Sequence, residues 1–265
     1  MADPNEGYLA KLPSLCCFVG AIHDGTPKGT EAELAGVPTY VARPPDGVPA
    51  NGHVVLYFPD VWGLSINAKL LIDGFAAAGF TALGMDYFRG DDISNYRSMD
   101  GKKQPPPDFN QPAWRNKHFT FASENVPVWT EAAKKAYGTD GSRYACVGYC
   151  FGAPFVCDLL AAESVAAGAI AHPSQMKEAH FRSSKKPLFL SCAEHDHAFS
   201  TEARRQAIDI LMEQKTPYHE QLFYNVKHGF ATRGDLSDPY ERWVKEQSLQ
   251  GIINWFDYWL VRNKD

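Results

Sequence analysis

The chain has 265 residues and a formal net charge of -5 at pH 7. This length allows one large domain with a sizeable core, and the 45% apolar content is close to the globular average, which argues against disorder. The acidic balance argues against a nucleic-acid-binding protein, because such a protein needs a basic face. We therefore expect a single domain over residues 1–265 and a small-molecule partner rather than nucleic acid.

The cysteines and the N-terminus indicate a reducing compartment. Six cysteines are too few for a disulfide scaffold, and the adjacent Cys16 and Cys17 have no C-x-x-C partner that would indicate zinc. The N-terminus carries early acidic residues and only a short apolar run, unlike a signal peptide, and no apolar segment is long enough to span a bilayer. We expect a cytoplasmic protein, monomeric or homodimeric, without membrane contact, metal or cofactor.

Strand-like and helix-like segments alternate along the chain, which predicts a mostly parallel sheet with helices on both faces. The expected strands are Val37–Pro44, His53–Pro59, Phe80–Phe88, Arg143–Tyr149, Val165–Pro173, Lys186–Glu194 and Tyr218–Tyr224. The expected helices are Asn67–Gly79, Glu124–Gly138, Phe151–Ser164, Thr201–Lys215 and Pro239–Val261. Gly79 is the expected C-cap of the first helix, and Thr201 is the expected N-cap of the fourth.

The segment Asp92–Trp114 is polar and proline-rich, with three prolines at Pro105–Pro107. A loop this long inside a compact domain is usually functional or mobile. A disordered surface excursion is one interpretation, and a lid near residues 92–122 is the other. The lid is favoured by the aromatic residues Phe109, Trp114, Phe119 and Phe121.

A cysteine stands between two glycines in the middle of the chain. The stretch Val147–Pro154 reads VGYCFGAP, and its G-x-C-x-G spacing matches the G-x-S-x-G nucleophile elbow of α/β-hydrolases. There the nucleophile occupies a strained turn between a strand and a helix, and the glycines allow close packing. Cysteine can replace serine because its thiolate is the stronger nucleophile. Cys150 is otherwise a small apolar residue in a buried turn, but the expected strand and helix around it favour a nucleophile.

An acid and a histidine follow in the order that this fold requires: nucleophile, then acid, then histidine. Asp196 follows the expected strand Lys186–Glu194, and His228 follows the expected strand Tyr218–Tyr224. Each candidate stands at the carboxyl end of a strand, where open α/β sheets bind ligands. The sequence therefore predicts an α/β-hydrolase fold with a triad of Cys150, Asp196 and His228.

The chemistry of such a triad assigns the roles. Cys150 opens a helix, so its thiolate would lie near the positive end of the helix dipole, and His228 would take or share its proton. Asp196 would hold the imidazole in one tautomer and stabilise the imidazolium. The oxyanion needs two backbone amide donors. We expect Phe151, directly after the nucleophile, and Val61, in the loop after an earlier strand.

Other histidines and cysteines leave alternatives open. His195 and His197 flank Asp196, so a metal site and a different catalytic base are two alternatives, although no third ligand with zinc spacing accompanies them. His172 and His118 are expected to be structural or to line the pocket. The remaining cysteines lie in expected core elements, where small buried cysteines are common, and these are Cys146, Cys157 and Cys192.

These motifs together resemble the dienelactone hydrolase family of α/β-hydrolases, and in particular its fungal branch. The resemblance rests on the cysteine elbow GYCFG, on EHD after a late strand and on HGF at the histidine. It extends from Cys16–Gly29 through PDVWG, MDYFRGD and HGFATRGD to the last helix, which is nearly the whole chain. The resemblance implies a hydrolase with a Cys-His-Asp triad and no cofactor.

The resemblance also implies substrate-binding residues. Members of the family bind a substrate carboxylate with arginines at the places that Arg89 and Arg233 occupy here, and a guanidinium grips a carboxylate through two hydrogen bonds. A surface salt bridge is the alternative role of each arginine. Bacterial members carry a glutamate before the oxyanion amide, which restrains the resting thiol, and the shorter Asp60 stands there. Neighbours that complete the expected substrate-binding set are Trp62, Tyr149 and Phe230.

We therefore expect a hydrolase that opens a lactone or cleaves an ester, with a substrate that can bear a carboxylate, through a covalent thioester on Cys150. A thioesterase or a C–C bond hydrolase of secondary metabolism could use the same triad. A non-catalytic ligand-binding protein could use the same fold. The complete triad counts against this last alternative.

Overall fold

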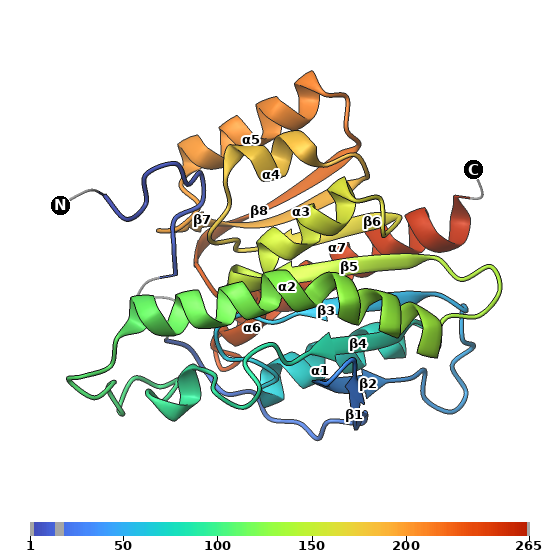
Figure 1. Ribbon diagram of the computed structural model, residues 1–265, viewed down its shortest axis with the longest axis horizontal. Coiled ribbons are helices and arrows are strands. Elements are labelled where there is room, and N and C mark those ends of the chain that lie inside the picture. Colours follow the sequence, from blue (N-terminus) through green and yellow to red (C-terminus); the bar gives the residue numbers. More distant parts are fainter. Residues whose placement is uncertain (1–2, 14–18, 264–265) are drawn as a thin grey trace.

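The structure is a computed structural model that describes residues 3–13 and 19–263. Its centre is an eight-stranded sheet in the order β1-β2-β4-β3-β5-β6-β7-β8 (Figure 1). Neighbouring strands from β4 to β8 are parallel, and β2 runs antiparallel to both β1 and β4. The strands are β1 (Thr30–Leu34), β2 (Val37–Ala42), β3 (Val54–Phe58), β4 (Thr81–Met85), β5 (Tyr144–Tyr149), β6 (Ala167–Ala171), β7 (Leu188–His195) and β8 (Tyr218–Lys227).

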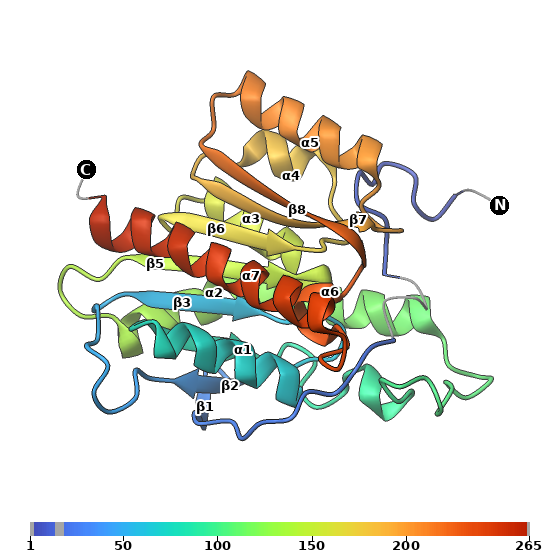
Figure 2. The ribbon, with the colours of Figure 1, turned by 180° about the vertical axis from the view of Figure 1, so that it is seen from behind.

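Helices cover both faces of the sheet, as the alternating pattern predicts, and the fold is that of an α/β-hydrolase. One face carries α2 (Gln111–Tyr137), α3 (Ala153–Ala161), α4 (Glu178–Ser183) and α5 (Thr201–Glu213), which stand in front of the sheet in Figure 1. The other face carries α1 (Ile66–Ala77), α6 (Phe230–Arg233) and α7 (Pro239–Phe256), which Figure 2 shows in front. Short 3-10 turns at Ile93–Asn95 and Cys150–Gly152 and a π-helical end at Asp257–Arg262 complete the elements.

Each face of the sheet has its own apolar core, and β3 contributes to both. Val54, Leu56 and Phe58 pack into the core under α2 and α3, whereas Val55 and Tyr57 pack into the core under α1 and α7. Alternate side chains of a strand point to opposite faces, so a strand buried on both faces must be apolar throughout. This explains why the central strands are continuous apolar runs in the sequence.

Three elements were not predicted because each lacks the usual signal. The edge strand β1 reads TEAEL, and its polar side chains are mostly exposed, so no apolar run marks it. The helices α4 and α6 span 6 and 4 residues, too few for a helical period to be recognised. The cap of α5 was predicted wrongly by one residue. The hydroxyl of Ser200, rather than Thr201, accepts the hydrogen bond from the amide of Ala203 at 3.3 Å.

The predicted loop from Asp92 is shorter than expected, because α2 begins at Gln111 and not at Glu124. The side chain of Asn110 caps α2 by accepting from the amide of Ala113 at 3.0 Å. A proline in the first turn of a helix costs no hydrogen bond, so the Pro-rich composition hid this start. Of the aromatic residues in this segment, Trp114, Phe119 and Phe121 therefore lie on the helix.

A buried histidine fastens this segment to the chain that follows β4. His118 on α2 lies with its Nε2 atom 3.0 Å from Oδ2 of Asp91. The same carboxylate binds Nζ of Lys117 at 2.6 Å and the hydroxyl of Tyr96 at 2.6 Å. The Trp114 ring stacks on Phe88 at 5.4 Å between centroids. His118 is thus structural, one of its two expected roles.

No helix of the described residues is both long and apolar enough to cross a membrane.

Candidate active site

Cys150 lies in the strained turn between β5 and α3. Its backbone φ is 49°, a left-handed conformation that side chains other than glycine rarely adopt. The flanking glycines are required by close backbone approach. A Cβ atom on Gly148 would overlap the carbonyl oxygen of Gly152, and one on Gly152 would overlap the carbonyl oxygen of Phe58. The strand, the tight turn and the helix expected around Cys150 are therefore all present.

His228 and Asp196 form a buried pair beside this turn. Nδ1 of His228 lies 2.8 Å from Oδ1 and 3.0 Å from Oδ2 of Asp196, and the two side chains are 1% and 2% exposed. The amides of Ala198 and Phe199 donate to Oδ1 of Asp196 at 2.8 and 3.0 Å. Burial opposes ionisation of Asp196, but the charge of His228 and these hydrogen bonds hold the pKa of this carboxyl below its usual value.

The pKa of His228 is raised to about 10 from an ordinary value of 6.5. Burial alone lowers it, but the negative charges of Asp196 and of the Cys150 thiolate, and hydrogen bonds to both groups, outweigh burial. The pair therefore favours a protonated imidazole whenever the sulfur carries a negative charge. The sulfur also lies 3.4 Å from the hydroxyl of Ser174, and Cys150 and Ser174 are both fully buried.

The loop after β3 is folded by the side chain of Asp60. Oδ1 of Asp60 accepts from the amide of Trp62 at 2.9 Å, and the carbonyl of Asp60 accepts from the amide of Gly63 at 3.0 Å. The carbonyl of Val61 accepts from the amide of Ile93 at 3.1 Å, whereas the Val61 amide itself has no hydrogen-bond partner among the described residues. Val61 belongs to the same buried cluster as Cys150 and Phe151, the other expected oxyanion donor.

The other oxygen of Asp60 binds Arg233. Oδ2 of Asp60 accepts from Nη1 of Arg233 and from the hydroxyl of Thr232, the latter at 2.8 Å. Burial raises the pKa of Asp60, the Arg233 charge lowers it, and a negative charge on Cys150 raises it, so that the net shift is upward. Nε of Arg233 donates to the carbonyl of Val19 at 3.0 Å. In this structure Arg233 is therefore an ion-pair partner of Asp60 rather than an unengaged cation.

Asn67, buried at the start of α1, links segments that are far apart in the sequence. Its Oδ1 accepts from the amide of His23 at 2.8 Å. Its Nδ2 donates to the carbonyls of Ala21 and Thr232 at 2.8 and 2.9 Å. The amide of Ala21 in turn donates to the carbonyl of Arg233 at 2.9 Å. One amide side chain thus holds the segment around Ala21 against the helix α6.

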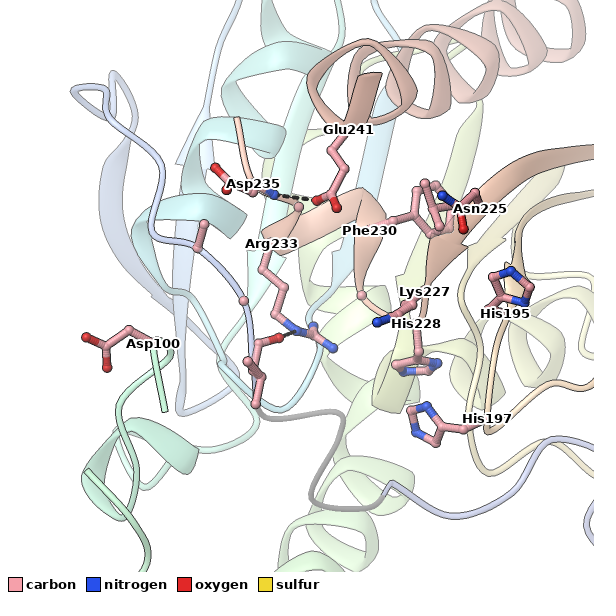
Figure 3. A pocket seen from close by; sticks show the side chains of 16 residues that line it. Asp100, His195, His197, Asn225, Lys227, His228, Phe230, Arg233, Asp235 and Glu241 are labelled. Atoms are coloured by element: carbon pink, nitrogen blue, oxygen red, sulfur yellow. Dashed lines mark hydrogen bonds between the residues drawn. The ribbon is translucent and has the colours of Figure 1, made fainter. Parts of the chain in front are cut away.

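A cavity of about 960 Å³ opens at this end of the sheet. Figure 3 shows the rings of His228 and His197 close together and Arg233 in the neighbouring wall of the cavity. The ring centroids of His228 and His197 are 4.8 Å apart. Asp100 brings the segment before α2 to the rim. Cys150 is fully buried and does not line this cavity.

The expected substrate-binding residues divide into three groups. Phe230 and Arg233 line the cavity. Trp62 and Tyr149 are buried, at 3% and 1% exposed, and Tyr149 packs against His172 at 5.8 Å between centroids. Arg89 is exposed, is absent from the described lining of the cavity, and places its guanidinium carbon 3.7 Å from the centre of the Phe121 ring. Of the two arginines expected to bind a carboxylate, Arg233 thus lies at this cavity and Arg89 does not.

Within residues 3–13 and 19–263, one group of side chains has the geometry to hold a metal ion. Ligand atoms of Asp196, His197 and His228 lie within 4.8 Å of one another. The carboxylate of Asp196, however, already accepts hydrogen bonds from His228 and from two amides. Two of the three potential ligands are thus engaged with each other. His195 is exposed, with its Nε2 atom 3.6 Å from Oε2 of the half-buried Glu194. Cys16 and Cys17 lie outside the described residues.

Sequence reasoning missed the proximity of two side chains to the triad. Ser174 touches the sulfur of Cys150, and His172 packs against His228 at 5.0 Å between ring centroids, edge to face. His172 was expected only as a structural or pocket-lining residue, which agrees with its burial. The available signal was position, because both residues follow the strand β6, directly beside the nucleophile strand β5.

Comparisons with known proteins agree with this fold and show the family. Residues 37–260 match the family model described as the dienelactone hydrolase family. The chain is 44% identical to dienlactone hydrolase 1 of Gibberella moniliformis over 264 residues, which cover 99% of this chain and 100% of that protein. Dienlactone hydrolase 2 of the same organism is 38% identical over 259 residues, 97% of this chain and 99% of that one. A putative dienelactone hydrolase from Klebsiella pneumoniae shares the fold, with a TM-score of 0.68 at 16% identity over 86% of this chain and 98% of that one.

Proposed function

Because the chain belongs to the dienelactone hydrolase family, as its motifs predicted, and is a hydrolase of the lactone and ester class, we propose that it acts through a covalent thioester on Cys150. The observation that carries this proposal is the buried His228–Asp196 pair beside a cysteine in a left-handed turn. Such a pair can take the proton of a nucleophile and stabilise the resulting imidazolium.

The proposed reaction has two halves. The sulfur of Cys150 passes its proton to Nε2 of His228 and attacks the substrate carbonyl. The oxyanion that forms accepts hydrogen bonds from the amides of Val61 and Phe151. Collapse of the tetrahedral intermediate breaks the ester bond, and the leaving oxygen takes the proton back from His228. A water molecule, deprotonated by His228, then attacks the thioester and releases the acid and the free thiol.

Asp60 and Arg233 form the proposed gate on the thiol. A negative charge on Cys150 disfavours ionised Asp60, so by reciprocity ionised Asp60 disfavours the thiolate at rest. A resting neutral thiol resists oxidation, because the thiolate is the reactive form. A substrate carboxylate would compete with Asp60 for Arg233 and thereby link binding to activation. Arg89, Trp62, Tyr149 and Phe230 remain proposed as further contacts of a substrate that enters.

Substrate entry requires an opening, because the sulfur of Cys150 has no solvent exposure. We propose the segment near residues 92–122 as the lid, since Asp100 stands at the rim of the cavity. The whole chain then acts as one catalytic domain. The cytoplasmic location and the monomeric or homodimeric state remain predictions of the sequence.

Mass spectrometry of the intact protein during turnover tests the proposed function. The protein is mixed with a panel of lactones, activated esters, thioesters and activated ketones, beside Cys150→Ala, His228→Ala and the matched control Cys192→Ala. We expect an acyl adduct on Cys150 in the wild type and in Cys192→Ala, because Cys192 is a buried cysteine on β7 outside the site. We expect kcat to fall by several orders of magnitude in Cys150→Ala and His228→Ala. Undiminished ester or lactone turnover by Cys150→Ala would contradict the proposal.

A further inference from the structure

The turn after β6 reaches the reacting sulfur. The hydroxyl oxygen of Ser174 lies 3.4 Å from Sγ of Cys150, within hydrogen-bond distance for sulfur, and both residues are fully buried. The backbone amide of Ser174 donates to the carbonyl of Cys150 at 3.1 Å. Ser174 therefore contacts the cysteine through its side chain and its main chain. Among the described residues, the hydroxyl of Ser174 forms its hydrogen bond with this sulfur.

This turn is held in an unusual backbone conformation. His172 and Gln175 have positive φ values of 35° and 59°. The amide of His172 donates to the carbonyl of Ser191 at 3.0 Å, and the amide of Gln175 donates to the carbonyl of Lys11 at 2.9 Å. Backbone strain of this kind persists only where the surrounding structure fixes it, and it concentrates at functional sites. The position of the Ser174 hydroxyl is thus set by the fold on both sides.

The same turn also touches the imidazole. His172 is fully buried and packs edge to face against His228, with 5.0 Å between ring centroids. Burial and the neighbouring positive charges, His228 first among them, hold the pKa of His172 well below 6.5. His172 is therefore neutral and supports the ring of His228 without adding a positive charge beside it. The turn borders both partners of the proton transfer.

A buried thiolate needs hydrogen-bond donors. A buried charge without partners is strongly disfavoured, and hydrogen bonds to charged groups are stronger than those between neutral groups. A serine hydroxyl rotates freely about its C–O bond, so it can accept from a thiol and donate to a thiolate. Ionised Asp60 cannot donate a hydrogen bond to the thiolate, because an ionised carboxylate only accepts hydrogen bonds.

We propose that Ser174 is a catalytic residue whose hydroxyl donates a hydrogen bond to the Cys150 sulfur once the sulfur has passed its proton to His228. The S–H bond breaks, the proton goes to Nε2 of His228, the electron pair stays on sulfur, and Ser174 keeps its own proton throughout. The inference rests on the proposed function, since it assigns Cys150 as the nucleophile. It adds a donor to the sulfur itself, distinct from the amides assigned to the substrate oxyanion.

Alkylation of Cys150 by iodoacetamide as a function of pH tests this role without any substrate. The rate is followed by mass spectrometry of the peptide that contains Cys150, for the wild type, Ser174→Ala, Ser174→Thr and Ser191→Ala. Ser191 is the matched control, because it is a buried serine on β7 whose hydroxyl binds Ser248 at 2.7 Å. We expect the pH midpoint of alkylation to rise by about one pH unit in Ser174→Ala, the size of a lost hydrogen bond to a charge.

The two remaining variants separate the hydroxyl from packing. Ser174→Thr keeps the hydroxyl and is expected to keep the wild-type midpoint, as is Ser191→Ala. An unchanged midpoint in Ser174→Ala overturns the inference, and so does an equal shift in Ser174→Ala and Ser174→Thr. Thermal unfolding monitors the fold of each variant, and Ser174→Gly answers the same question if Ser174→Ala does not fold.

The result is also separable from the fate of the proposed function. A shifted midpoint in Ser174→Ala together with a wild type that hydrolyses no ester or lactone would uphold the hydrogen bond and contradict the hydrolytic reaction. Ester or lactone turnover that is lost in Cys150→Ala but unaffected by Ser174→Ala, with an unshifted midpoint, would uphold the hydrolase and overturn the role of Ser174.

Discussion

Two histidines of this protein each face an aspartate, and their pKa values are shifted in opposite directions. His228 faces Asp196 and has its pKa raised to about 10, whereas His118 faces Asp91 and has its pKa lowered. The N···O distances are 2.8 and 3.0 Å, so contact geometry does not explain the difference. Both histidines are buried, and burial lowers both pKa values. The difference must come from the other charges around each pair.

The charge of Asp91 is shared, and the charge of Asp196 is not. Asp91 binds Lys117 as well as His118, its side chain is 28% exposed, and the positive charges of Lys117 and Arg89 act against protonation of His118. Asp196 is 2% exposed and its pair adjoins the negative charge of the Cys150 thiolate. A buried histidine next to an aspartate is therefore not by itself a catalytic pair. It becomes a proton acceptor where no cation competes for the carboxylate and where a second negative charge develops nearby.

The largest expected difference between the two pairs is in kcat/KM after each carboxylate is removed in turn. Asp196→Asn is expected to lower kcat/KM for an ester or lactone by about 10⁴-fold, because the imidazole loses both its tautomer and its counter-charge. Asp91→Asn is expected to change kcat/KM far less, because His118 lies outside the triad and holds α2 to the chain after β4. Steady-state kinetics on the two variants makes the comparison. An equal loss in both variants would mean that the Asp91 pair takes part in the reaction.

The pH dependence of stability separates the two histidines by sign. The folded pKa of His228 exceeds 6.5, so its proton stabilises the fold fully below about pH 6.5 and this contribution is lost as pH rises toward 10. The folded pKa of His118 is below 6.5, so its contribution is present above about pH 6.5 and is lost as pH falls through the folded pKa. Urea unfolding of His228→Gln and His118→Gln against the wild type from pH 5 to pH 10, roughly the span of these shifts, measures both.

The free energy of unfolding of the two variants is expected to differ most from that of the wild type at opposite ends of that pH range. The free-energy gap between the wild type and His228→Gln should shrink with rising pH. The wild type should lose stability relative to His118→Gln with falling pH. Parallel pH profiles for the two variants would contradict the assigned directions.

The smallest expected effect comes from removing Lys117, the cation that binds Asp91 and has no counterpart at Asp196 among the described residues. In Lys117→Met the pKa of His118 should rise, because a positive charge is removed and Oδ2 of Asp91 no longer serves two donors. The pKa of His228 should not change, which gives an internal control. Titration of the histidine ring protons by NMR reports both values in one sample. A constant His118 pKa would show that the charge of Lys117 does not hold it down.

Much of the site was predictable because local pattern and chain order specify it. The G-x-C-x-G spacing predicted the turn at Cys150, and the order of the following strands predicted where Asp196 and His228 come together. The alternation of strands and helices and the residues that follow each strand were enough for this prediction, since parallel strands present their carboxyl ends at one edge of the sheet. The long-range partner of a surface or loop residue has no such signal. Arg233 was expected to meet a substrate carboxylate, and in the structure it pairs with Asp60.

The missed parts depend on three-dimensional neighbours or lack a local pattern in the sequence. The contact of Ser174 with Cys150 requires that β6 lies next to β5. The residues around Ser174 carry no pattern that predicts this. The start of α2 at Gln111 was hidden by a proline that a first helical turn accepts. The edge strand β1 has too few buried residues to leave a pattern. Only the contact of Ser174 involves a residue distant in the sequence, whereas β1 and the start of α2 lack a recognisable local pattern.

The hydrogen bonds of Asn67 have a consequence for the order in which the protein is completed during synthesis. The amide of Asn67 holds Ala21 and His23 against Thr232, which is synthesised 165 residues after Asn67. The segment around Ala21 is therefore translated well before the residue that completes this junction. Throughout translation the growing chain exposes this junction to chaperones and proteases, and chains that stop before Thr232 cannot close it.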